Sequence, residues 1–110
     1  MQYCYKAYVT EVYDGDTITV DIDLGFCMWI KKEKIRLYGI DAPELRGESR
    51  EEGLKSRNWL REQILNKEIV LETIKDKREK YGRMLGRIFI NDIYINDEMI
   101  AFGLAIKAPW

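Results

Sequence analysis

The chain has 110 residues and carries 18 Lys and Arg against 19 Asp and Glu, which gives a formal net charge of −1. This near balance excludes a protein that attracts nucleic acid through a strong overall positive field, although basic residues cluster over 31–36 and 75–87. The sequence has no histidine, and serine occurs only at positions 49 and 56, outside any nucleophile-elbow pattern. Serine–histidine triads and histidine general bases are therefore excluded, so any hydrolysis must use carboxylates, arginines, a metal ion and water.

The length suits one domain, which we expect to span residues 1–110. There is no run of about 18 apolar residues, and the N-terminus lacks the basic and apolar regions of a signal peptide. We therefore expect a monomer without membrane association, cytoplasmic or otherwise unexported, unless a leader was removed before Met1. Cys4 and Cys27 form no C-x-x-C motif, and we expect both to be buried or partly buried free thiols.

The first half of the chain predicts strands. Residues 3–13 alternate loosely between apolar and polar side chains, "DGDT" makes a turn, and residues 17–23 alternate with a clear period of two. The inward side chains of this second segment are Ile18, Val20 and Ile22. Its outward side chains are Thr17, Thr19, Asp21 and Asp23. A bent or bulged stretch over 24–29 precedes a third strand at about 34–40.

The second half predicts a helix, further strands and a short final helix. The helix covers about 50–66 and has one apolar face with Trp59 pointing elsewhere, against a loop or a neighbouring helix. Strands follow at 69–74 and at "MLGRIFI" and "IYI", which a type I′ turn at Asn91-Asp92 connects. Asn96 suits the N-cap of a helix over about 97–105. This order predicts a mainly β, α+β domain: a five-stranded OB-fold barrel with one helix after strand 3 and one at the C-terminus.

Three clusters of residues could carry chemistry: "DGDT" at 14–17, "RLYGIDAPE" at 36–44 and "KYGR" at 80–83. Each alone is an ordinary turn or strand end. Together they meet the needs of phosphodiester hydrolysis without histidine, which requires a hard cation, a positioned water and cationic groups that bind phosphate. Candidate metal ligands are the carboxylates of Asp16 and Asp41 and a backbone carbonyl near Ala42, and Glu44 could orient or deprotonate the attacking water.

Two arginines are the candidates for phosphate binding. Arg36 and Arg83 each carry a planar guanidinium that can grip phosphate oxygens in pairs. The alternation of the third strand places Arg36 on one face with Tyr38 and Ile40, so we expect its side chain to point into a concavity. The loop that begins at Asp41 would form the rim of that concavity.

The motifs "DGDT", "IRLYGIDAPE" and "KYGRMLGRIFI" occur in this order, with a predicted helix between the last two and "INDEMIAFGLA" near the end. Together they resemble the staphylococcal nuclease (thermonuclease-like) family over about residues 8–106, and the chain looks like the compact bacterial or phage members. The resemblance implies an OB-fold nuclease that uses one Ca²⁺ ion. Such an enzyme hydrolyses DNA, RNA or both by in-line attack of a water held by the metal and a glutamate, and leaves a 3′-phosphate.

The resemblance also implies a role for each site residue. The metal ligands would be Asp16, Asp41 and the backbone carbonyl of Ala42. Glu44 would act on the attacking water, as a base or by orienting it, while Arg36 and Arg83 would stabilise the transition state. The residues that would contact the phosphate of the bound nucleotide are Lys80 and Tyr81.

The sequence departs from the family's archetype at several points. Ala42 stands where the archetype has a threonine, the segment between "DGDT" and Arg36 is longer, and the loop after Glu44 is shorter. Trp110 is the candidate replacement for a later nucleotide-stacking tyrosine. Two other function classes remain open: a non-catalytic OB-fold module that binds nucleic acid, and an interaction or inhibitor domain on the same barrel. The retained acids and arginines favour the nuclease over both.

Overall fold

A computed structural model describes residues 3–108, and of Lys77 it describes the backbone alone. The longer strands are β1 (Cys4–Asp14), β2 (Thr17–Gly25), β3 (Met28–Leu37), β5 (Glu68–Arg78) and β6 (Met84–Ile90). The short strands are β4 (Ile40–Asp41), β7 (Ile93–Tyr94) and β8 (Ile106–Lys107). A 3₁₀ turn at Gly47–Ser49 leads into α1 (Arg50–Ile64), and α2 (Ile95–Ala101) follows β7. Within these residues, no helix combines the length and apolar character required to cross a membrane.

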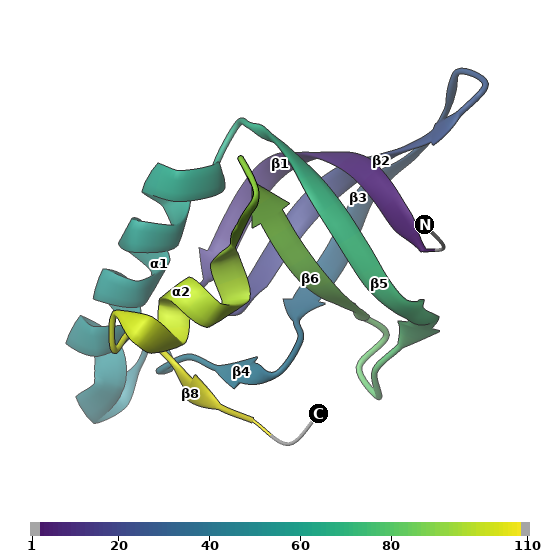
Figure 1. The fold of residues 1–110 in the computed structure, drawn as a ribbon. Coiled ribbons are helices and arrows are strands. Elements are labelled where there is room, and N and C mark those ends of the chain that lie inside the picture. Colours follow the sequence, from purple (N-terminus) through teal and green to yellow (C-terminus); the bar gives the residue numbers. More distant parts are fainter. Residues whose placement is uncertain (1–2, 109–110) are drawn as a thin grey trace.

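The five longer strands close into a barrel, which confirms the predicted OB-type fold. The sheet order is β3-β2-β1-β5-β6, and a parallel pairing of β3 with β6 joins the two edges. The helix α1 packs against β1 and α2 against β6 (Figure 1). The closing contact is short, because only Ile35–Leu37 of β3 pair with β6, and the inward side chains fill the interior as an apolar core.

The alternation of β2 is only partly confirmed. Ile18, Val20 and Ile22 are buried as predicted, but Thr17 and Thr19 are buried as well. These threonines lie on the face opposite the core residues, as predicted, but they are covered by other parts of the protein instead of being exposed. The reason for Thr17 is tertiary, because its hydroxyl accepts a hydrogen bond from the guanidinium of Arg83, which lies over this end of the barrel.

The third strand begins well before the predicted residue 34. The chain reverses at Phe26 and Cys27, whose φ angles of 52° and 60° form a tight hairpin turn, and β3 starts at Met28. The β2–β3 hairpin projects from the barrel, and Phe26 at its tip is 99% exposed (Figure 1). Cys27 is exposed, so its predicted burial is wrong, whereas Cys4 is partly buried and both thiols are free.

The first helix matches its prediction closely. It buries Leu60 and Ile64 against the barrel, and Trp59 turns toward Phe102 at the end of α2, with ring centroids 5.6 Å apart. Helix α1 also comes very close to the loop after β4. A Cβ atom on Gly53 would lie 2.5 Å from the backbone oxygen of Glu44, so only glycine allows this approach.

The predicted N-cap role of Asn96 is wrong. Helix α2 begins at Ile95, and Asn96 lies inside its first turn, fully buried. Its side chain accepts a hydrogen bond from the amide of Ile88 and donates to the carbonyls of Tyr38 and Gly86. Asn96 therefore ties α2 to β6 and to the segment after β3. The predicted I′-type turn at Asn91-Asp92 is confirmed by positive φ angles of 50° and 66°.

Candidate active site

Strand pairing brings the three motifs to one end of the barrel. Thr17 at the start of β2 pairs with Arg36 in β3, and Arg36 pairs in turn with Leu85 near the start of β6. The acidic turn before β2, the end of β3 and the "KYGR" turn before β6 are thus neighbours in space. Closure of the barrel, rather than proximity in sequence, assembles the site.

The acidic turn is held by its own side chains and by close packing. The carboxylate of Asp14 accepts a hydrogen bond from the amide of Asp16 at 3.0 Å, which fixes the turn. Between them, a Cβ atom on Gly15 would lie 2.7 Å from the Cβ of Ala42 and 2.8 Å from that of Ser56. The turn is therefore pressed between the loop after β4 and helix α1, and a glycine is required there for space.

Asp16 is buried and connects the turn to two other parts of the site. Its Oδ2 atom accepts a hydrogen bond from the amide of Ala42 at 2.9 Å, and its Oδ1 atom accepts one from the hydroxyl of Thr17 at 3.1 Å. Asp16 Oδ2 also lies 3.4 Å from Nη2 of Arg36. One carboxylate thus organises the loop after β4, the start of β2 and a guanidinium.

Arg36 is almost completely buried, with 6% of its surface exposed. Its Nη1 atom donates to the carbonyls of Leu37 and Ile40, both at 2.9 Å, and its Nη2 atom lies 3.4 Å from a carboxylate oxygen of Asp41. The strand stops at Leu37, and Gly39, with a φ angle of 80°, turns the chain. The predicted continuous strand face through residue 40 is therefore wrong, and the turn itself brings Ile40 and Asp41 back to the guanidinium.

The loop that carries the remaining acids is more open. The side chain of Asp41 is about half exposed, and that of Glu44 is 74% exposed and pairs with Arg46 at 3.6 Å. Among the described residues, no hydrogen bond joins the Glu44 carboxylate to the buried network around Asp16. The structure thus brings Asp16, Arg36, Asp41 and the Ala42 backbone together, and leaves Glu44 at the solvent edge.

Arg83 is held by two side chains. Its Nε and Nη2 atoms donate to the two carboxylate oxygens of Glu79, each at 3.1 Å, and its Nη1 atom donates to the hydroxyl of Thr17 at 3.1 Å. Glu79 also accepts hydrogen bonds from the backbone amides of Tyr81 and Arg83, and these bonds shape the "KYGR" turn. Through Thr17, a continuous chain of hydrogen bonds runs from Asp16 to Arg83.

Lys80 and Tyr81 lie beside the two arginines. They line a cavity of about 520 Å³ together with Arg36, Glu79, Arg83 and Leu85. The exposed ring of Tyr81 lies 5.1 Å from Lys80 Nζ and 5.6 Å from the guanidinium carbon of Arg83. The cavity therefore combines an aromatic face with three cations, although Glu79 offsets part of that charge.

The ionisation of the site follows from burial and pairing. Burial raises the pKa of Asp14 to about 6, and the adjacent Asp16 carboxylate adds to the increase. Hydrogen bonds from Arg83 lower the pKa of Glu79, and the same contact raises the pKa of Arg83. Burial first, and the neighbouring Asp16 second, thus disfavour the ionised form of Asp14, whereas Glu79 and Arg83 each stabilise the charged form of the other.

The donor set fits a hard divalent cation. Carboxylate oxygens are the ligands that Ca²⁺ and Mg²⁺ prefer, and those of Asp16 and Asp41 both approach Arg36 Nη2 at 3.4 Å. A cation beside Asp14 would favour its ionised form and relieve the raised pKa. In residues 3–108, no three acidic, cysteine or histidine side chains form a ready-made cage, so water and backbone oxygens would complete the coordination shell.

Three residues of this network were not assigned a role from the sequence: Asp14, Thr17 and Glu79. Signals for two of them exist, because "DGDT" contains a second acid two residues before Asp16, and Glu79 stands four residues before Arg83. Nothing local indicates that the Thr17 hydroxyl meets Arg83, since that contact depends on the barrel. Trp110, the candidate stacking residue, lies outside the described residues.

Comparisons with known proteins show what this chain is similar to. A profile described as staphylococcal nuclease homologue matches residues 34–109. The chain is 31% identical over 100 residues to a thermonuclease of Staphylococcus intermedius, with 88% of this chain and 56% of the relative covered. It is 34% identical over 98 residues to an uncharacterised endonuclease of Escherichia coli O157:H7, covering 88% and 57%. An uncharacterised protein of Methanocaldococcus jannaschii is 29% identical over 126 residues, covering 92% and 58%.

The chain spans a little over half the length of these curated relatives. The profile nevertheless covers most of the chain, including the end of β3, the loop after β4 and the "KYGR" turn. On the profile match and these identities, the chain belongs to the staphylococcal nuclease homologue family.

Proposed function

We propose that this protein is a divalent-cation-dependent nuclease that hydrolyses phosphodiester bonds in DNA, RNA or both. The observation that carries the proposal is the convergence at one barrel end of two carboxylates and two guanidiniums. Asp16 and Asp41 flank Arg36 at 3.4 Å, and Thr17 connects Asp16 to Arg83 by hydrogen bonds. Membership of a family with relatives named thermonuclease and endonuclease supports the same reaction.

The metal would be held by Asp16 and Asp41, with the carbonyl of Ala42 and water as further ligands. A bound Ca²⁺ would polarise the phosphate and neutralise its developing charge. The fixed position of Asp16 supports this role. Its carboxylate accepts hydrogen bonds from the Ala42 amide and the Thr17 hydroxyl and lies 3.4 Å from Arg36, and the turn before it is tightly packed at Gly15.

Arg83 would bind the scissile phosphate in the cavity that it shares with Lys80 and Tyr81. Its contact with Glu79 orients the guanidinium before the substrate arrives, so less side-chain freedom is lost on binding. Donors fixed in advance stabilise charge that develops on phosphate oxygens in the transition state. Arg36 would act from the floor of the same cavity.

Glu44 would serve the attacking water. Its carboxylate lies at the solvent edge and outside the buried network, three residues after Asp41 in the sequence. An exposed carboxylate can approach a water and accept its proton, or orient it for in-line attack opposite the leaving oxygen. The close contact between Gly53 and the Glu44 backbone fixes the base of this loop against α1.

A cleavage assay tests the proposal. Labelled single-stranded DNA, duplex DNA and RNA are each incubated with the purified protein in CaCl₂, in MgCl₂ and in chelator. We expect cleavage with a divalent cation and none in chelator. A folded protein that binds these strands without cutting them under any of these conditions would contradict the nuclease and favour the binding module.

Substitution of Arg83 tests its assigned role. Arg83→Lys keeps the charge but loses the planar fork, and we expect kcat to fall about 100-fold, the effect of removing one preorganised transition-state donor. Arg87→Lys is the matched control, because Arg87 pairs with Glu72 and stacks on Tyr38 away from the acidic turn. Equal losses in the two variants would refute a specific role for Arg83.

A further inference from the structure

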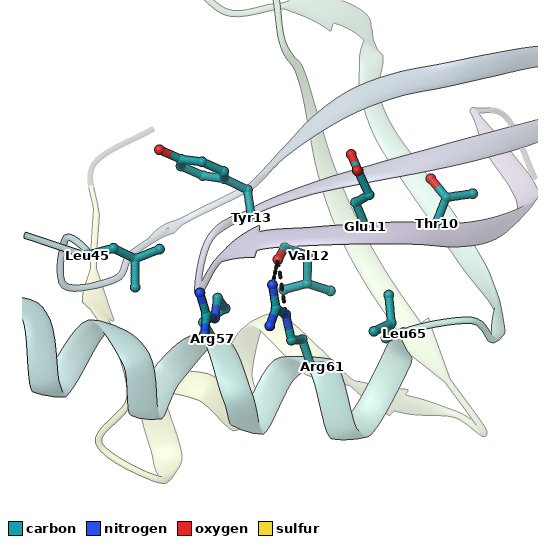
Figure 2. Close-up of a pocket in the computed structure, with 8 residues that line it drawn as sticks. All are labelled: Thr10, Glu11, Val12, Tyr13, Leu45, Arg57, Arg61 and Leu65. Carbon is teal, nitrogen blue, oxygen red and sulfur yellow. Dashed lines mark hydrogen bonds between the residues drawn. The ribbon is translucent and has the colours of Figure 1, made fainter.

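A second concave surface adjoins the acidic turn. It is a groove of about 360 Å³ between the C-terminal half of β1 and helix α1, hereafter the β1–α1 groove (Figure 2). Its lining includes Tyr13, Leu45, Arg57 and Arg61. The volume is within the range of sites that bind small ligands, and the function proposed above does not use this surface.

The β1–α1 groove and the Tyr81 cavity flank the acidic turn. The sheet order β3-β2-β1 places β1 on one side of β2 and β3 on the other. Tyr13 leads into the turn from β1, and Thr17 leaves it toward Arg83 and the cavity. Leu45, at the end of the groove, directly follows Glu44. A nucleic-acid strand with one phosphate at the acidic turn can therefore extend in both directions along the protein, into the cavity and into the groove.

The two arginines of the groove point toward β1. Arg57 and Arg61 are four residues apart on α1, and both side chains point toward β1 (Figure 2). Arg61 donates from Nε and Nη2 to the carbonyl of Val12, each at 3.3 Å, so its guanidinium is held in place. Among the described residues, Arg57 donates side-chain hydrogen bonds to Asn58 alone, both long at 3.4 Å, and can turn to an incoming anion.

The other side chains of the groove suit the sugar and base of a nucleotide. The ring of Tyr13 is 69% exposed and stands beside Leu45 above the arginines (Figure 2). The carboxylate of Glu11 points away from α1 in the same view. Exposed aromatic rings next to guanidiniums bind single strands by stacking and by contact with phosphate.

We propose that the β1–α1 groove binds the nucleotide next to the scissile phosphate, on the side opposite Tyr81, with its outer phosphate at Arg57 and its base or sugar against Tyr13. This rests on the proposed nuclease function. A nucleotide bound in the groove would make the enzyme prefer a nucleic-acid strand that extends on both sides of the cleaved bond over a substrate that ends at the reacting phosphate.

The test compares a labelled single-stranded 10-mer with the 3′- and 5′-(4-nitrophenyl phosphate) esters of thymidine, which carry a nucleoside on one side of the phosphate only. Arg57→Ala should lower the ratio of kcat/KM for the 10-mer to kcat/KM for the cleaved ester about tenfold, the effect of one charge-assisted contact. Lys55→Ala removes the same charge from an exposed position of α1 outside the groove and should leave the ratio unchanged. An unchanged ratio in Arg57→Ala would overturn the proposal.

Salt dependence gives a second readout. The slope of log(kcat/KM) for the 10-mer against log[salt] is negative and should become less negative by about 0.7 in Arg57→Ala, the value for one phosphate contact on a single strand. Tyr13→Phe should retain binding and Tyr13→Ala should weaken it, because stacking needs the ring and not the hydroxyl. Equal slopes in Arg57→Ala and Lys55→Ala would contradict a phosphate at Arg57.

A binding assay separates failure of the groove from failure of the nuclease. If the unaltered protein cleaves neither substrate, the nuclease proposal fails, and fluorescence anisotropy of the labelled 10-mer still tests the groove. Arg57→Ala should then bind the 10-mer about tenfold more weakly than Lys55→Ala. Equal affinities would overturn the groove, whatever the outcome for catalysis.

Discussion

Arg36 and Arg83 carry the same guanidinium in different surroundings. Arg36 is buried and donates to the backbone carbonyls of Leu37 and Ile40 as well as approaching Asp16. Arg83 has a side chain 25% exposed, and its partners are the side chains of Glu79 and Thr17. Arg36 therefore stabilises a turn of the main chain. Arg83 is positioned on the barrel surface by two side chains, which can be substituted without removing a hydrogen bond between backbone groups.

The comparison shows that loss of activity has different meanings at the two positions. Removing Arg36 disturbs the end of β3 and leaves a buried carboxylate without its cation, so any loss of activity includes a loss of structure. Removing Arg83 leaves the main chain intact. Arg83 is therefore the position at which catalysis can be tested separately from folding.

We expect the largest effect from Arg36→Met, and we expect it on the stability of the fold. This variant leaves Asp16 uncompensated and two buried carbonyls without donors, and its free energy of unfolding should fall by about 3–5 kcal/mol. Arg83→Met, the matched control, should lose about 1 kcal/mol or less, because its ion pair is partly exposed. Urea unfolding in chelator measures both. Equal losses would show that the burial of Arg36 does not matter to folding.

A smaller effect should follow from Gly15→Ala, which disturbs the acidic turn next to Asp16. The new methyl group would lie 2.7 Å from the Cβ of Ala42, so the loop or α1 must shift, at a cost of about 1–3 kcal/mol. Adding Ala42→Gly removes the nearest contact and should restore part of the loss. Thermal and urea unfolding of the single and double variants measure this coupling. Wild-type stability in Gly15→Ala would contradict the close packing described for the turn.

The barrel and most of the candidate site could be predicted from the sequence, because both leave local signals. Alternation in β2 and the order of strands and helices gave the fold, and the three motifs located Asp16, Arg36 and Arg83. These signals do not report which distant groups a side chain meets. The burial of Thr17 and of Asn96 depends on contacts across the barrel. The alternation of β2 therefore gave no sign that Thr17 is covered, and the sequence around Asn96 predicted a helix cap.

The early start of β3 has a different cause. Phe26 and Cys27 lack the Asn-Gly signature of a tight hairpin, yet both adopt positive φ angles. Pairing of Gly25 with Met28, and the hydrogen bond from the Gly25 amide to Asp23, support this turn despite its unfavourable residues. Phenylalanine and cysteine are unfavourable at positive φ, so the sequence predicts a bend where the hairpin in fact continues.

The smallest effect concerns Glu79, and it tests whether Arg83 is held as described. Hydrogen bonds from Arg83 lower the pKa of Glu79 in the folded protein below that of the unfolded chain. As pH falls, the unfolded chain binds the proton first, so the stabilising contribution of this carboxylate is present above about pH 4.5 and is lost as the pH drops through the lowered pKa. Glu79→Gln should therefore cost at most about 1 kcal/mol at pH 7, after allowance for solvent screening, and progressively less in acid.

A double-mutant cycle attributes that pH dependence to the pair. In the Arg83→Met background, the effect of Glu79→Gln on the free energy of unfolding should depend less on pH, because the guanidinium that is the largest cause of the lowered pKa is absent, while the backbone amides of Tyr81 and of position 83 remain. Urea unfolding of the four proteins across this pH range measures the coupling. If the pH dependence persisted without Arg83, the amides of the "KYGR" turn would be the principal partners of Glu79, and Arg83 would be oriented chiefly by Thr17.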